Sequence, residues 1–253
     1  MSTTVISQAD LRPRSAVDRA PLLRWMIFTG ATIFAMALLW HFGLVKLMIA
    51  SDRTYISSVI SVLYVAASLH CLWRTIAVSR EAEASARIER GFADGSMVMA
   101  DVASSNSLPP GLIADHIRNL QLKALTQGAG RLDQTLLLRG LADKLRSSNG
   151  LGAFAGDTLM KLGLLGTIIG FIIMLAPIAG FDVGNRALMK SSMGLMSDGM
   201  AVAMYTTLAG LVGSILVKIQ YYALDAATAQ VFSQAVTLTE TRIVPALERR
   251  HVG

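Results

Sequence analysis

Four long stretches without Asp, Glu, Lys or Arg dominate the pattern of hydrophobic and polar positions along the chain. They cover residues 25–45, 54–73, 162–181 and 199–217. Each has about 20 residues, which is enough for a helix to cross ~30 Å of hydrocarbon. No segment shows the alternating pattern of a strand. We therefore predict an all-α polytopic membrane protein with four transmembrane helices and a helical cytoplasmic segment.

The polar stretches divide the chain into five predicted regions. We expect a cytoplasmic N-terminal tail (1–24), a first transmembrane hairpin (25–73), a helical cytoplasmic segment (74–161), a second hairpin (162–217) and a cytoplasmic C-terminal helix (218–253). Within the central segment, residues 76–103, 112–126 and 131–147 have the composition or apolar spacing of helices. The first run is too long for a cleavable signal peptide, so we interpret it as an anchor.

Composition and charge agree with a membrane protein. The chain is 53% hydrophobic and 16% charged, with a mean hydropathy of +0.52, whereas disorder needs low hydrophobicity and high net charge. A single cysteine, Cys71, excludes a disulfide scaffold. The two tails and the central segment carry nineteen Lys and Arg residues, and the two short loops carry four. This bias predicts that both termini are cytoplasmic, and it explains the basic pI without nucleic acid.

The spans contain few ionisable residues. His41 and His70 lie near the ends of the first two spans, where an interfacial position is the expected one and a proton relay is the alternative. No span contains a carboxylate. A proton pathway through these helices would therefore need a partner to carry the proton.

The third and fourth spans each carry a face of small residues. One face holds Gly163, Thr167 and Gly170, with Gly166 and Gly170 forming a GxxxG pair. The facing positions in the fourth span are Ala203, Thr207, Gly210 and Ser214. Small residues let helix backbones approach closely in lipid, and threonine hydroxyls can bond across the contact. The faces can serve helix packing alone, line a narrow pathway, or receive a helix from another chain.

These two segments resemble the motifs of a known family. Leu162-Gly163-Leu164-Leu165-Gly166-Thr167-Ile168-Ile169-Gly170 is similar to the third-span motif of the MotA/TolQ/ExbB proton-channel family. Ala203-Met204-Tyr205-Thr206-Thr207-Leu208-Ala209-Gly210-Leu211 resembles the final-span motif of that family. The resemblance is specific over residues 157–225, and the four predicted spans look more like the MotA branch. It implies channel-facing roles for Thr167, Thr206 and Thr207, with the small residues packing at the channel.

The resemblance also implies a mechanism. Family subunits form a pentamer in the bacterial inner membrane around single-span partners of the MotB, ExbD or TolR type. An intramembrane aspartate of the partner takes and releases a proton, and the complex converts ion-motive force into work as a stator or an envelope energiser. On this interpretation the chain is neither an enzyme nor dependent on a cofactor or a metal.

The chain departs from the family pattern at two positions, and it also lacks the proline that ends the last span of ExbB and TolQ. ExbB and TolQ carry a glutamate where this chain has Val202, and many members carry a proline where it has Met160. The flagellar branch uses charged cytoplasmic residues to contact its rotor. Arg80, Glu83, Arg87 and Arg90 are the candidates here, together with Glu89, and a solvated helix face is the alternative interpretation of these charges.

Other functions are weighed against this one. A tetraspan scaffold or assembly protein without ion conduction is the main alternative, and a small-solute carrier is another. No catalytic triad, metal-spaced ligand set or phosphate loop supports an enzyme. The sequence leaves open whether the ion is H⁺ or Na⁺ and which machine is driven.

Overall fold

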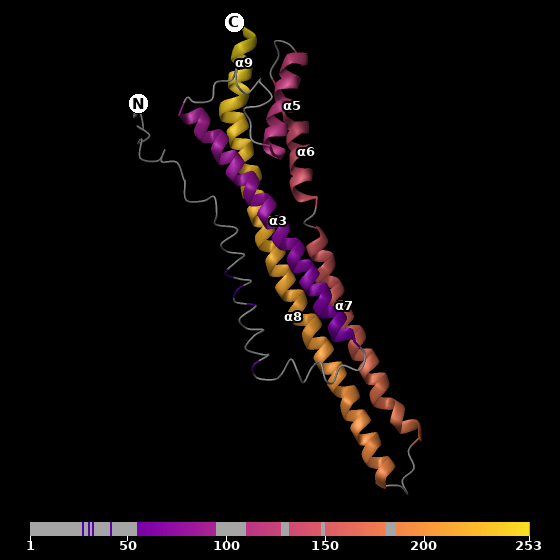
Figure 1. Ribbon diagram of the computed structural model, residues 1–253. Coiled ribbons are helices and arrows are strands. Elements are labelled where there is room, and N and C mark those ends of the chain that lie inside the picture. Colours follow the sequence, from indigo (N-terminus) through magenta and orange to yellow (C-terminus); the bar gives the residue numbers. More distant parts are fainter. Residues whose placement is uncertain are drawn as a thin grey trace, which may run out of the picture.

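The computed structural model describes a long helical molecule. It describes Ile27, Gly30, Thr32, His41 and the ranges 55–94, 110–127, 132–147, 150–180 and 186–252. The helices are α3 (Ile56–Ala93), α5 (Leu112–Gln127), α6 (Thr135–Arg146), α7 (Gly150–Leu175), α8 (Arg186–Leu238) and α9 (Val244–Val252), with a 3₁₀ helix η2 (Ala176–Gly180) and a π-helix η3 (Thr239–Ile243). No strand occurs in these ranges, which confirms the all-α prediction for them. Figure 1 shows α3 lying along the α7–α8 hairpin, with α5, α6 and α9 gathered at one end, called the α5/α6 end below.

Three helices in the described ranges, α3, α7 and α8, are long and apolar enough to cross a membrane. They contain residues 56–73 of the second predicted run, residues 162–175 of the third and the whole of the run 199–217. The predicted span at 25–45 lies outside the described residues except for four positions, all of them helical. Within the described residues, three of the four predicted spans are therefore present as long apolar helices.

The spans continue well beyond the apolar runs. Helix α3 has 38 residues, so the second predicted span and the helix predicted from residue 76 are one element, which ends at Ala93. Residues 95–103 of that predicted helix lie outside the described residues. Helix α8 has 53 residues, or about 80 Å at 1.5 Å per residue. Arg186 and Lys190 belong to α8, although the sequence placed them in a loop. The prediction that the fourth span continues as a helix toward the C-terminus is confirmed.

Proline marks the end of α7. Pro177 has no N–H group, and its ring clashes with the carbonyl four residues earlier in an α-helix. The α-helix accordingly stops at Leu175, and the tighter 3₁₀ turns of η2 contain Pro177.

Polar contacts attach the short helices to the long ones. The carboxylate of Glu81 on α3 accepts hydrogen bonds from the N–H groups of Leu112 and Ile113, at 2.9 and 3.4 Å, and so caps α5. Arg74 donates to the carbonyl of Leu145 at the end of α6, at 2.9 Å. Large aliphatic side chains then form the core of the α5/α6 end: Ile88, Ile113, Ile117, Leu120, Leu141, Leu145, Leu238 and Ile243.

Candidate ion-pathway site

The α7–α8 contact is built from small residues that bring the two backbones together. A Cβ atom added to Gly170 would lie 2.6 Å from the backbone nitrogen of Ala203. One added to Gly210 would lie 2.7 Å from the Cα of Gly163. Real Cβ atoms do not approach other atoms so closely. A larger residue at Gly170 or Gly210 would therefore push the helices apart.

Thr206 lies inside this contact. Its side chain is completely buried, and a Cβ on Gly166 would overlap it. Its hydroxyl donates to backbone carbonyls of its own helix, with the carbonyl of Val202 at 2.8 Å. The structure thus places Thr206 between the helices, in the packing contact.

Thr167 and Thr207 lie at one edge of the same contact. Their hydroxyl oxygens are within hydrogen-bonding distance of each other across the two helices. Thr207 is exposed and Thr167 is half-buried. Carbonyl oxygens surround the pair: that of Gly163 lies 3.2 Å from the Thr167 hydroxyl, and that of Ala203 lies 2.9 Å from the Thr207 hydroxyl.

This hydroxyl pair has unused accepting capacity. Each threonine has one O–H donor and two acceptor lone pairs. The two hydroxyls together have two hydrogens to donate, either to the neighbouring carbonyl oxygens or to each other. At least three of their four lone pairs therefore remain free to accept a hydrogen bond from a donor outside the pair. A water molecule, a hydronium ion or a protonated side chain of another chain fits that requirement.

The two edges of the α7–α8 contact differ. Helix α3 covers one edge, where Leu162 and Ala209 pack against the core and Tyr64 approaches Gly213. The threonine pair lies at the other edge, where apolar side chains on both helices are exposed: Leu164, Ile168, Phe171, Met204, Leu208 and Leu211. In the described part of the chain, the threonine edge is therefore the uncovered one.

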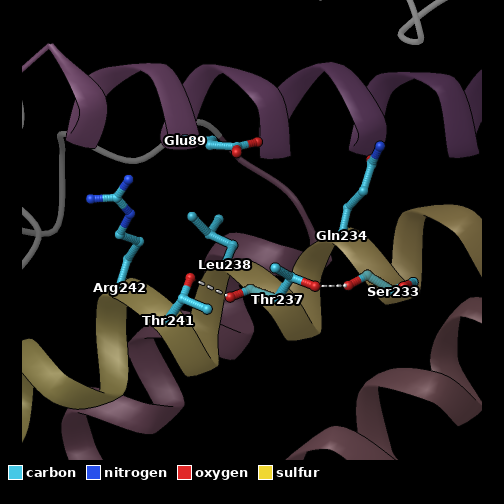
Figure 2. A pocket seen from close by; sticks show the side chains of 7 residues that line it. All are labelled: Glu89, Ser233, Gln234, Thr237, Leu238, Thr241 and Arg242. Carbon is cyan, nitrogen blue, oxygen red and sulfur yellow. Dashed lines mark hydrogen bonds between the residues drawn. The ribbon is translucent and has the colours of Figure 1, made fainter. Parts of the chain in front are cut away.

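The remaining predicted positions fall in several places. Ser214 and Val202 are both buried on α8. Arg80, Arg87 and Arg90 are exposed on α3, and Glu83 is half-buried. Their neighbour Glu89 on α3 and Arg242 on η3 both line a small pocket between α3 and the α8–η3 junction (Figure 2).

His70 has a partner that the sequence did not indicate. Its Nδ1 lies 2.7 Å from the hydroxyl of Tyr221, and the two rings stack with centroids 6.2 Å apart. Tyr221 in turn packs over Gly152, where a side chain would overlap the ring. Cys71 is fully buried, the position expected of a packing residue. Among the described residues, no group of three or more His, Cys, Asp or Glu side chains could hold a metal.

The small-residue contact is longer than the predicted faces. It also includes Gly152, Gly156 and Gly199. From Gly152 to Gly170 the buried positions of α7 repeat at steps of four and three, through Gly156, Leu159, Gly163 and Gly166. That spacing is visible in the sequence and could have revealed the full contact.

Comparison with known proteins fits the geometry of this site. A model of the MotA/TolQ/ExbB proton channel family matches residues 129–236. This segment belongs to that family. No curated protein and no solved structure matched the chain.

The matched segment contains α6, α7 and most of α8, and hence the threonine pair. The predicted resemblance of residues 157–225 to the MotA/TolQ/ExbB family is confirmed. The match and the apolar helices support a membrane protein with a role in energy transduction, and the matched family is one of proton channels. The MotA-like branch depends on the predicted span at 25–45, which the described residues leave untested.

Proposed function

We propose that the protein is the channel subunit of a proton-driven complex in the bacterial inner membrane, with both termini cytoplasmic. It works with a single-span partner of the MotB, ExbD or TolR type and converts ion-motive force into mechanical work. The observation that carries this proposal is the Thr167–Thr207 pair, which joins two facing spans at the edge that α3 leaves uncovered.

The partner follows from what the hairpin lacks. Residues 162–181 and 199–217 contain no carboxylate, so these spans have no group of their own that can carry a proton by ionising. A partner helix with an intramembrane Asp would supply that group. Packed against the uncovered edge, it would meet the two hydroxyls and a surface of apolar side chains.

The proposal also includes how the copies of the chain assemble and which surface contacts the driven machine. Several copies of the chain, five by analogy with the family, would surround the partner helices and present their threonine edges to them. The charges of α3, namely the exposed Arg80, Arg87 and Arg90 and the half-buried Glu83, are the proposed cytoplasmic contacts to the driven machine. Thr206 and the glycines Gly163, Gly166, Gly170 and Gly210, together with Ala203 and Ser214, would keep the hairpin closely packed.

Native mass measurement of the complex, extracted gently from its own membranes, tests the assembly. The proposal expects several copies of the chain together with a single-span protein that has one intramembrane Asp. The fold of the partner's other domain would then indicate motility or envelope transport. An oligomer that contains no acidic partner helix would contradict the proposal and favour the scaffold function.

A further inference from the structure

An ion pair joins α7 and α8 beyond the threonine pair. The Nζ atom of Lys218 lies 2.8 Å from Oδ1 of Asp157, and both side chains are about half exposed, at 48% and 52%. The stem of Lys218 passes over Gly156, where an added Cβ would lie 3.0 Å from the lysine Cγ. Gly156 therefore leaves room for Lys218 to reach the carboxylate.

This pair lies where the apolar runs of the hairpin end. Lys218 directly follows the uncharged run 199–217, and Asp157 and Lys161 directly precede the run 162–181. Charged side chains are costly inside hydrocarbon. The pair therefore marks the boundary of the bilayer on the side of the α5/α6 end.

Lys218 and Thr207 lie on the same face of α8, whereas Asp157 and Thr167 on α7 differ by about 80° in direction. Lys218 follows Thr207 by eleven residues, a rotation of about 1,100°, which differs from three full turns by only about 20°. The rise over this distance is about 16 Å, and on α7 the ten residues from Asp157 to Thr167 span about 15 Å. The threonine pair thus lies about half of the hydrocarbon thickness above the ion pair.

The surface between the two pairs is apolar apart from Lys161, an exposed cation one turn from Asp157 on α7. Met160 and Leu164 on α7, and Leu211 and Ile215 on α8, are all exposed there. Ser214, also on this stretch of α8, is buried. A proton that leaves the threonine pair toward the α5/α6 end therefore meets Asp157 as its first carboxylate on these two helices.

We propose that Asp157 is the proton acceptor at this end of the pathway and that Lys218 is its positioning residue. The inference rests on the proposed channel function. A proton arriving as hydronium binds a carboxylate oxygen of Asp157, leaving water and a neutral carboxyl group, and the ion pair with Lys218 opens. Asp157 then releases the proton to water outside the bilayer, and the ion pair forms again while Lys218 stays protonated throughout.

The test is proton flux through the full complex, reconstituted with its partner in liposomes and driven by a potassium diffusion potential. Asp157→Asn keeps the shape of the side chain and removes proton uptake, so we expect flux to fall by about tenfold or more. Asp157→Glu keeps the carboxylate and should retain flux within about threefold. Asp143→Asn removes an exposed carboxylate on α6 and is the matched control, with unchanged flux expected.

The variant Lys218→Met distinguishes a proton acceptor at Asp157 from an ion pair that only holds α7 and α8 together. Without the lysine charge the carboxylate holds its proton more tightly, so the pH profile of flux should shift to higher pH on the α5/α6 side. If the ion pair only holds the helices together, the pH profile should not shift, and Asp157→Asn and Lys218→Met should lose flux equally. Flux should then recover in the exchanged double variant Asp157→Lys/Lys218→Asp. That set of results would overturn the proposal.

Failure of this inference differs from failure of the proposed function. Unchanged flux in Asp157→Asn, with flux lost in Thr207→Val, would overturn the role of Asp157 and leave the channel intact. A wild-type complex that conducts no protons would overturn both. If Asp157→Asn does not assemble, the pH profile of Lys218→Met decides, because that variant keeps the carboxylate.

Discussion

The two halves of α8 pack with the same spacing and different side chains. In the apolar half most of the buried contact residues are small: Gly199, Ala203, Thr206 and Gly210, with Val202 as the larger exception. Toward the α5/α6 end large residues occur among smaller ones: Val217, Tyr221, Leu224, Val231 and Leu238 are buried there together with Ala227, Thr228 and Ala235. Steps of three and four residues connect most of these positions, as in a coiled coil.

The surrounding solvent explains this difference. Lipid is as apolar as leucine, so burying a large side chain in the membrane contributes little, and close backbone contact stabilises the helix pair instead. In water each Å² of buried apolar surface contributes roughly 25 cal/mol, which favours large side chains. The change occurs near Val217 and Lys218, where the ion pair with Asp157 also lies.

The largest effect on stability is expected in the half with large side chains. Leu224 is almost fully buried, so Leu224→Ala should lower the free energy of unfolding by about 2–5 kcal/mol. Denaturant unfolding in detergent, followed by circular dichroism, measures this change. The control Leu125→Ala removes a leucine that is 73% exposed, and a comparable loss there would argue against the assigned core.

A smaller loss of stability is expected when a small residue is enlarged in the apolar half of α8. Gly210→Ala adds a Cβ 2.7 Å from the backbone of Gly163 and should destabilise the hairpin by about 1–3 kcal/mol. The matched change Gly194→Ala, on the same helix, meets nothing within 4 Å. It should be neutral or stabilising by up to about 1 kcal/mol, because alanine favours helix. Equal effects of both variants in thermal unfolding would contradict the close backbone contact.

The smallest expected effect is a change of stability with pH, which arises from a histidine at the α5/α6 end. Burial lowers the pKa of His116 from its usual 6.5, and the neighbouring Gln134 opposes this shift in part. Below pH 6.5 the unfolded chain therefore takes up a proton that the folded chain does not, and stability falls by at most about 1.4 kcal/mol per pH unit. His116→Leu should flatten the stability curve between pH 5 and 6.5.

A second titrating group provides the internal check on that curve. Hydrogen bonds from Thr135 lower the pKa of Asp133 below its usual 3.8. Its contribution to stability is present above 3.8 and is lost as the pH falls through the lower folded value. The two groups therefore act in separate pH ranges. A stability curve that stays flat from pH 7 to 5 in the wild type would contradict the role of His116.

Much of the helical architecture could be predicted from the sequence, because uncharged runs and small-residue spacing are local signals. The lengths of α3 and α8 could not, since no local signal separates a span from its helical continuation into water. The sequence also grouped Thr206 with Thr207, whereas the structure buries the first and exposes the second. Adjacent helical residues differ by about 100° in direction, and only the position of the partner helix shows which one faces it. The Tyr221–His70 and Asp157–Lys218 pairs depend on contacts between distant segments, which spacing within one segment does not reveal.

Proton flux through the reconstituted complex tests the central claim most directly, by comparing Thr207→Val with Thr206→Val. Both changes replace a hydroxyl with a methyl group of similar size, at neighbouring positions of one helix. The account predicts that Thr207→Val, like Thr167→Val, abolishes flux and work output while the complex still assembles. Thr206→Val should keep most of the flux, because its hydroxyl bonds only to carbonyls of its own helix. Equal flux in all three variants and the wild type would contradict the claim that the threonine edge is the ion pathway.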